Sequence, residues 1–435
     1  MLVLLGAASI PLAAAFAVAA ARAPLILVAV YAFVIPFGSG IDLPVPLPAG
    51  FDSLTSLAGL LALAGLSLHL VFARQRAIEL PSAAPVWLWF LAVSLLTYLW
   101  SVNPDTSGDE LRALAILVAL YLACSLVSVD RRSLAHVEAA IIAGGAVTGL
   151  LAAYQLATAT IVVSGDGVAR FRTGVGGEEG DPNITAATLM LPLVLALARG
   201  VHGGRPLPRA ASLVAAALIA TAIILTASRG GAIAAVVAIG VLAASDARGR
   251  TIAVYAGLPV LLTATVLAFA PSTLTDRFEK PGSTGRGDVW RLGLAACPQY
   301  CWAGSGWGTF PDVYERQVLA SASGKGNRLR FQAHNIVLAM AIEAGLVALA
   351  LTVLALALTA RELVRLPRGI RAPPLAALVG VLVSNMFVAN FDYKYFWLVL
   401  VYAVLVVEGE RSQPQPRSLD DRPTLRSERA SMTPP

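Results

Sequence analysis

The chain has 435 residues, of which 57% are apolar and only 13% are charged, and its formal net charge is +6. So small a charged fraction excludes a water-soluble globular protein. Apolar runs of ~17–25 residues recur along the chain, and each has the length of a helix that crosses a ~30 Å hydrocarbon core. Because these runs lack the alternation of a membrane β-barrel, the sequence predicts an all-α polytopic membrane protein.

Thirteen apolar segments are predicted as membrane spans. The second is short and flanked by prolines, so the first two form either one crossing or two, which gives 12–13 transmembrane helices. The first segment has no basic start and leads directly into the next, so we expect it to remain in the mature protein. The predicted spans are 2–20, 24–37, 53–73, 84–101, 111–128, 135–157, 184–199, 209–227, 230–245, 250–270, 334–359, 372–390 and 395–408.

Arginines mark one face of this predicted bundle. Five alternate connections hold thirteen Arg against four acidic residues, whereas 38–52 and 101–109 hold no Lys or Arg. Positively charged connections remain in the cytoplasm, which fixes the orientation. The arginine-rich connections are 74–79, 130–132, 199–209, 246–250 and 361–371. The prediction thus divides the chain into a transmembrane helical domain, 1–410, and a disordered cytoplasmic tail, 411–435.

Residues 271–333 form the one large loop of the predicted fold, on the outer face. The loop contains eight basic and five acidic residues. Long loops escape the orientation rule, so this charge suggests an anionic partner, although ordinary solvated or headgroup-contacting arginines remain the alternative. Cys297 and Cys301 lie four residues apart in the loop, where a local disulfide is an open question, and Cys124 is predicted as a packing residue.

Of the four histidines, only His334 is predicted to lie outside, where the loop ends and a span begins. Histidine can take up and release a proton near neutral pH, so His334 is the candidate general base; an ordinary interfacial histidine is the alternative. Arg229 interrupts the long apolar run 209–245, which must turn there, with Ser228 capping a helix and the following glycines permitting the bend. Charges at this depth tend to be functional, and a snorkelling arginine is the alternative.

Two glycine-containing motifs stand in the large loop. Arg286 is followed by Trp290 and Arg291, and further on Gly304 and Gly306 flank a serine. Arginine suits phosphate oxygens, tryptophan suits sugar rings, and glycine allows close backbone approach. Neither motif matches a nucleotide-binding P-loop, so ATP use is not indicated. The outer side has no paired carboxylates and no His/Cys cluster with ligand spacing, which predicts a metal-independent site.

Several motifs match one family in chain order. On them, across roughly residues 170 to 390, the chain resembles the O-antigen ligase and O-antigen polymerase superfamily. They are Arg172-Thr173-Gly174 with Asp181-Pro182-Asn183, Thr226 to Gly230, Gly285-Arg286 with Trp290, Gly304-Ser305-Gly306, and His334-Asn335 followed by Glu343-Ala344-Gly345-Leu346.

The resemblance implies a GT-C-like glycosyltransferase of the bacterial inner membrane whose active site faces the periplasm. Its donor would be a glycan on undecaprenyl pyrophosphate and its acceptor a sugar hydroxyl of lipid A–core, with no cofactor and no nucleic-acid partner, and we expect a monomer. His334 would be the general base, and Arg229 and Arg286 would grip the pyrophosphate, with Arg172 a secondary candidate. The remaining predicted substrate-binding residues are Asn183, Trp290, Arg291, Gly304, Gly306, Lys325, Arg328, Arg330 and Asn335.

Glu343 lies nine residues beyond His334, about 13 Å deeper on an ideal helix, so it is predicted as an inter-helical partner. Asn335 or Asp288 is expected to touch the histidine instead. Three other functions stay open: an O-antigen polymerase, a protein O-oligosaccharyltransferase, and, from another class, a transporter or flippase for lipid-linked glycans. The compact loop, with no added soluble domain for a protein acceptor, favours the ligase.

Overall fold

The computed structural model describes residues 23–37, 41, 53–72, 79–158, 160–161, 170–173, 180–203, 205–245, 257, 286–320, 331–388, 391 and 393–412. The predicted span 2–20 lies outside these residues, as do the span 250–270 except Gly257, and the tail beyond Ser412.

Helices account for the secondary structure of the described residues, and no β-strand is present among them. The helices are α2 (Pro24–Val34), α3 (Leu54–Phe72), α4 (Ala84–Leu96) with the short η2 (Thr97–Trp100), α5 (Pro104–Ser125), α6 (Arg131–Ala157), α7 (Pro182–Thr188), α8 (Met190–His202), α9 (Pro206–Leu225), α10 (Arg229–Ala244), α13 (Arg286–Tyr300), α14 (Phe310–Ala320), α15 (Ile336–Glu343), α16 (Gly345–Val364), α17 (Arg368–Val388) and α18 (Lys394–Arg411).

Six of the described helical segments are long and apolar enough to cross a membrane, and three shorter apolar helices accompany them. The chain is therefore a multi-pass membrane protein, while a total of 12–13 crossings remains a prediction. The six are α3, α6, the joined α7–α8, α9, α16 and α17.

Two predicted spans are broken. The span 184–199 is divided between α7 and α8 at Leu189, and the span 334–359 between α15 and α16 at Ala344. At the second break Gly345 has a φ of +85°, which favours glycine. Loop residues dock there: the Ser305 amide donates to Ile342 O at 2.8 Å, and the Leu346 amide to Cys301 O at 2.7 Å. These bonds satisfy backbone groups that the interrupted helix leaves free.

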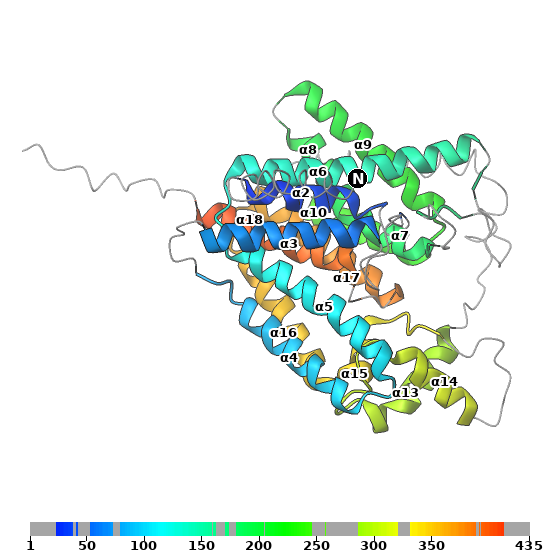
Figure 1. Cartoon of the computed structure of the whole chain (residues 1–435). Coiled ribbons are helices and arrows are strands. Elements are labelled where there is room, and N and C mark those ends of the chain that lie inside the picture. Colours follow the sequence, from blue (N-terminus) through cyan, green and yellow to red (C-terminus); the bar gives the residue numbers. More distant parts are fainter. Residues whose placement is uncertain are drawn as a thin grey trace, which may run out of the picture.

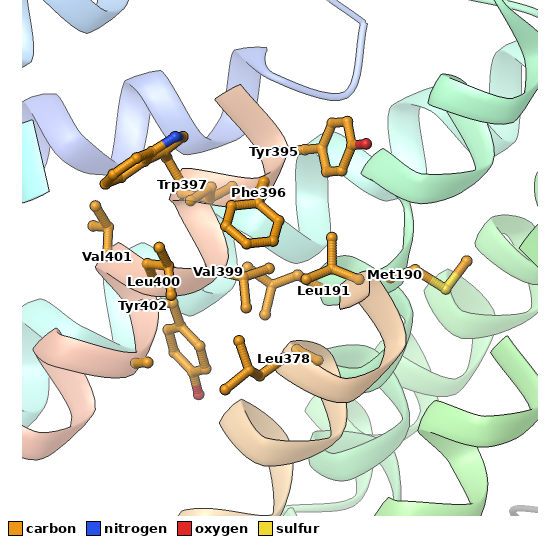
Figure 2. Close-up of a cluster of buried hydrophobic side chains, with 14 of the residues drawn as sticks. Met190, Leu191, Leu378, Tyr395, Phe396, Trp397, Val399, Leu400, Val401 and Tyr402 are labelled. Carbon is orange, nitrogen blue, oxygen red and sulfur yellow. The ribbon is translucent and has the colours of Figure 1, made fainter. Parts of the chain in front are cut away.

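The core of the bundle is built around α18, whose residues are almost all buried between Tyr395 and Gly409. A helix that is apolar all round is expected in the interior. Figure 2 shows its Phe396, Trp397 and Tyr402 packed with side chains of neighbouring helices. Trp397 also contacts Trp87 of α4 at 5.1 Å between ring centroids.

The two ends of the bundle differ in character. At one end Glu362 accepts hydrogen bonds from the amide and hydroxyl of Ser82, at 2.8 and 2.7 Å, and Arg411 lies 3.6 Å from the same carboxylate. This end carries the arginine-rich connection 361–371. At the other end α13 and α14 lie together beside α15 (Figure 1). The described part of the large loop is thus a compact helical cap at this end of the bundle.

Candidate active site

His334 lies in a fixed and unusual backbone conformation directly before α15. Its φ is +47°, a left-handed value that non-glycine residues adopt mainly at functional sites and turns. Trp290 donates its Nε1 to Ala333 O at 3.0 Å on one side. On the other side, Asn335 Oδ1 accepts from the amides of Val337 and Leu338 and caps the helix. Trp290 and Asn335, both predicted to bind substrate, thus position the histidine segment.

The surroundings of His334 favour its neutral form. Burial lowers the pKa of His334 below its ordinary value of 6.5, the Arg286 guanidinium lowers it further, and the Asp181 carboxylate raises it in part. The ring also packs edge-on against Phe331, with 5.9 Å between centroids. Its Nδ1 is buried and forms no hydrogen bond to any described residue. A neutral, partly desolvated imidazole is suited to accept a proton.

These electrostatic interactions involve residues from three segments that are far apart in the sequence. Asp181 precedes α7, Arg286 begins α13, and His334 precedes α15. We expected Asn335 or a loop carboxylate such as Asp288 to touch the histidine, but Asp288 pairs with Arg291 at 2.9 Å on the exposed side of α13. The carboxylate that acts on His334 is Asp181.

The turn between α9 and α10 places Arg229 as the first residue of α10. As predicted, Ser228 caps the helix, with its Oγ accepting from the Gly231 amide at 3.1 Å. The bend itself, however, uses Ala227, whose φ is +50°, rather than a glycine. The glycines serve packing instead: a Cβ on Gly230 would come within 2.7 Å of Phe387. Small residues let membrane helices approach closely, which here joins α10 to α17.

A buried arginine that the sequence interpretation missed holds this turn. Arg170 is 8% exposed and donates from Nε to Thr226 O at 3.0 Å and from Nη2 to Asn183 Oδ1 at 3.4 Å. Ser228 Oγ donates to the same Asn183 oxygen at 2.8 Å. Asn183 in turn donates its Nδ2 to Asp181 Oδ1 at 2.8 Å. This network, defined by Arg170, Asp181, Asn183 and Ser228, connects the Arg229 turn to the carboxylate that raises the pKa of His334.

The predicted residue Arg172 lies in the same short segment. Phe171 donates its amide to Leu225 O at 2.8 Å, which fixes the segment against the end of α9. Arg170 and Arg172 are two positions apart, but Arg170 is buried while Arg172 is only half-buried. Asn183, predicted to bind substrate, is a connector in the network.

Gly304 and Gly306 have φ values of +83° and +110°. A Cβ on Gly304 would lie 2.5 Å from Glu343 O, and one on Gly306 would collide with Ser101. In the structure, these glycines therefore allow two parts of the protein to approach each other closely, with Gly304 against Glu343 and Gly306 against Ser101. Glu343 Oε1 accepts from the Phe310 amide at 3.0 Å and links α15 to α14, which confirms its predicted inter-helical role.

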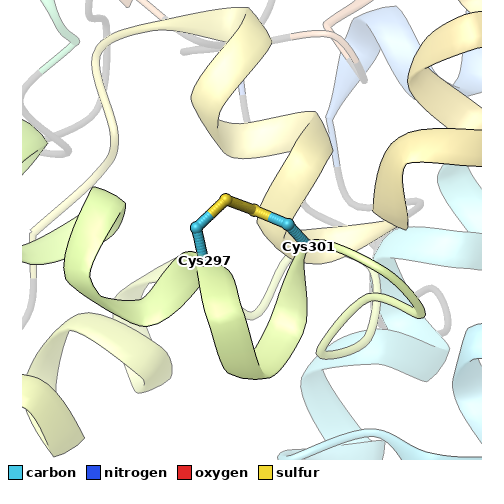
Figure 3. The surroundings of a disulfide bond; sticks show 2 residues. All are labelled: Cys297 and Cys301. Carbon is cyan, nitrogen blue, oxygen red and sulfur yellow. A yellow bond between two sulfur atoms is a disulfide. The ribbon is translucent and has the colours of Figure 1, made fainter.

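Cys297 of α13 forms a disulfide with Cys301, the residue that follows this helix, and their Cα atoms are 4.7 Å apart (Figure 3). The bridge answers the question that the spacing left open. Cys124 is buried and free, in keeping with a packing role.

Among the described residues, no group of three or more His, Cys, Asp or Glu side chains could hold a metal ion. Lys325, Arg328 and Arg330 lie outside the described residues, and their roles remain predictions.

The fold and this site define a multi-pass helical membrane protein in which Arg286 and Asp181 act electrostatically on His334. Residues 214–353 match the family model described as O-antigen ligase. Over this segment, about a third of its length, the chain is similar to a family of glycosyltransferase-like membrane enzymes, which supports the resemblance drawn from the motifs. The matched segment contains Arg229, Arg286 and His334. The search of curated proteins found no match.

Proposed function

We propose that the protein is an O-antigen ligase. It transfers the glycan from undecaprenyl pyrophosphate to a sugar hydroxyl of lipid A–core, on the periplasmic face of the bacterial inner membrane. The reaction uses neither ATP nor a metal ion. The observation that carries this proposal is that the family segment holds His334 in a fixed left-handed conformation beside the Trp290 hydrogen bond, with Arg286 of the same segment lowering its pKa.

In the proposed reaction, the acceptor oxygen attacks the anomeric carbon while His334 takes the hydroxyl proton. The bond from that carbon to the pyrophosphate oxygen breaks, and undecaprenyl pyrophosphate leaves with both electrons. A positioned base contributes ~10²–10⁴-fold to such a step. Arg229 and Arg286 hold the departing charge, and each such contact is worth ~3 kcal/mol in a water-poor site. Attack from the face opposite the leaving group inverts the anomeric configuration.

Two observations support the periplasmic side. The arginine-rich connections leave the cap of α13 and α14 on the outer face. The Cys297–Cys301 disulfide of this cap fits an oxidising compartment.

An O-antigen polymerase and a protein O-oligosaccharyltransferase remain the nearest alternatives, since both would use the same donor. The described part of the large loop consists of two short helices, α13 and α14. Acceptor choice depends on the shape of this region, and its small size supports a lipid-anchored sugar acceptor over a protein one.

The test uses purified protein in detergent, supplied with undecaprenyl-pyrophosphate-linked glycan and lipid A–core, with and without EDTA. We expect glycan-extended lipid A–core in both samples. Transfer in detergent, where no sealed compartment exists, excludes an obligate transporter or flippase. Product formed only on a second lipid-linked glycan identifies a polymerase, and inhibition by EDTA contradicts the metal-free mechanism.

A further inference from the structure

Lys394, the first residue of α18, lies against the start of α3. Its Nζ donates to Thr55 Oγ1 and Ser56 Oγ, each at 2.8 Å, and to Ser53 Oγ at 3.4 Å. One ammonium group is thus surrounded by three hydroxyl groups. The proposed reaction does not use these residues.

An apolar cavity of about 170 Å³ begins at Lys394 and Thr55. It lies between α3 and α5 and is lined further along by Leu60, Ile116 and Leu117. These two helices lie side by side in Figure 1. The cavity therefore has a cation at one end and apolar side chains along a membrane-spanning helix beyond it.

A more polar cavity of about 260 Å³ shares Lys394 and Thr55 and extends past Glu110 and Tyr393. Glu110 and Tyr393 also line a third cavity, of about 90 Å³, whose wall includes Gln332 and Ile336. These two residues stand two positions before and two positions after His334. The shared lining residues make the three cavities neighbours in a row, from the α3–α5 groove to the histidine segment.

We propose that this row of cavities binds the acceptor, and that the acceptor is a phosphate-bearing glycolipid. One lipid chain lies between α3 and α5, a phosphate group meets Lys394 and the hydroxyls of Thr55 and Ser56, and the sugars extend past Glu110 towards His334. A lysine ammonium is a compact point charge that suits phosphate, and an apolar groove next to it suits an attached chain.

This assignment rests on the proposed function and separates the two substrates in space. The donor pyrophosphate belongs with Arg229 and Arg286 at the starts of α10 and α13, whereas Lys394 starts α18 and contacts α3. Two lipid-linked substrates can then occupy the protein at the same time, with the reacting hydroxyl delivered to the histidine. A protein acceptor carries neither the chain nor the phosphate.

The first test compares Lys394→Met and Lys394→Arg with the wild type. We expect Lys394→Met to raise the acceptor KM about tenfold, the loss of one charge-assisted contact, while the donor KM stays unchanged. Lys394→Arg retains most of the affinity. With dephosphorylated lipid A–core, wild type and Lys394→Met have the same KM. The matched control, Arg365→Met, removes an exposed charge at the opposite end and changes neither KM.

The second test measures binding without transfer, by native mass spectrometry of the detergent-solubilised protein with phosphorylated lipid A. Lys394→Met and Ala113→Phe, which fills the α3–α5 groove, reduce the bound fraction, whereas Ala211→Phe on α9 does not. Inorganic phosphate in millimolar excess does not displace the lipid. Unchanged binding in both variants, or an increased donor KM, overturns the inference while the transfer reaction stands. Specific binding without any transfer overturns the proposed function and leaves a lipid site.

Discussion

His334 combines a left-handed backbone conformation with a buried ring nitrogen, and this combination allows a clean test of its role. Asparagine tolerates positive φ better than alanine does, so His334→Asn removes the base with the least added backbone strain. We expect transfer to fall by at least ~10²-fold while the thermal unfolding temperature stays near that of the wild type. Wild-type transfer rates in His334→Asn would remove the histidine from the mechanism.

The pH dependence of kcat/KM tests the electrostatic surroundings of this base. The proposed transfer requires a neutral imidazole, and burial and Arg286 lower the pKa of His334, so we expect the acid limb below pH 6.5. Asp181→Asn removes the charge that raises this pKa and therefore moves the limb to lower pH. Arg286→Gln moves it to higher pH. A limb that moves upward in Asp181→Asn would contradict the electrostatic effect of this carboxylate on the histidine.

The sequence shows which residue types are available for a reaction, but it does not show which residues contact one another. A single outer histidine and isolated loop arginines are visible as residue types, so His334 and Arg286 could be chosen. Arg170 could not, because its burial depends on Thr226 and Asn183, which are distant in sequence. The one available signal for Arg170 was its position two residues before Arg172, since residues two apart in an extended segment lie on the same side. The indole of Trp290, which was predicted to bind substrate, donates a hydrogen bond to the histidine segment, and this contact could not be read from the sequence.

At the scale of elements, the close packing of α10 on α17 is tested by two glycines of the same helix. A methyl group on Gly230 would meet Phe387 at 2.7 Å, whereas one on Gly240 would meet nothing within 4 Å. We expect Gly230→Ala to lower the free energy of unfolding by ~1–3 kcal/mol and to reduce transfer, since Arg229 shares the turn.

Gly240→Ala is the control for this change. Alanine favours a helix over glycine by up to ~1 kcal/mol, so this variant is neutral or slightly more stable. Equal stability of both variants, measured by denaturant unfolding in the same detergent, would show that α10 and α17 do not pack this closely.

Most helices are predictable from hydropathy, because a span needs a fixed length of apolar residues. The breaks at Leu189 and Ala344 are not, since the second depends on loop residues such as Ser305 that dock on the interruption. The Gly304 and Gly306 motif shows the same limit. Its sequence is equally compatible with a ligand site and with a close approach between two backbone segments. The structure shows the second, because Gly304 lies against the backbone of Glu343.

For the whole molecule, the state of the cysteines tests which side of the membrane the cap faces. Protein purified without reductant should leave Cys297 and Cys301 unlabelled by a thiol reagent, and reduction should make both reactive. Cys124 is buried and should react only after denaturation. Two reactive loop thiols before reduction, seen by mass spectrometry of the labelled peptides, would contradict an oxidising location.

The proposed transfer requires residues at the starts of α7, α10, α13 and α15 to serve one reaction at one end of the bundle. The most direct measurement is an experimental map of the protein in lipid with undecaprenyl pyrophosphate bound. We expect diphosphate density within hydrogen-bond distance of Arg229 and Arg286, with the imidazole of His334 facing the same space. Diphosphate bound at the opposite end, near Glu362 and Arg411, or far from the histidine, would contradict the proposed transfer.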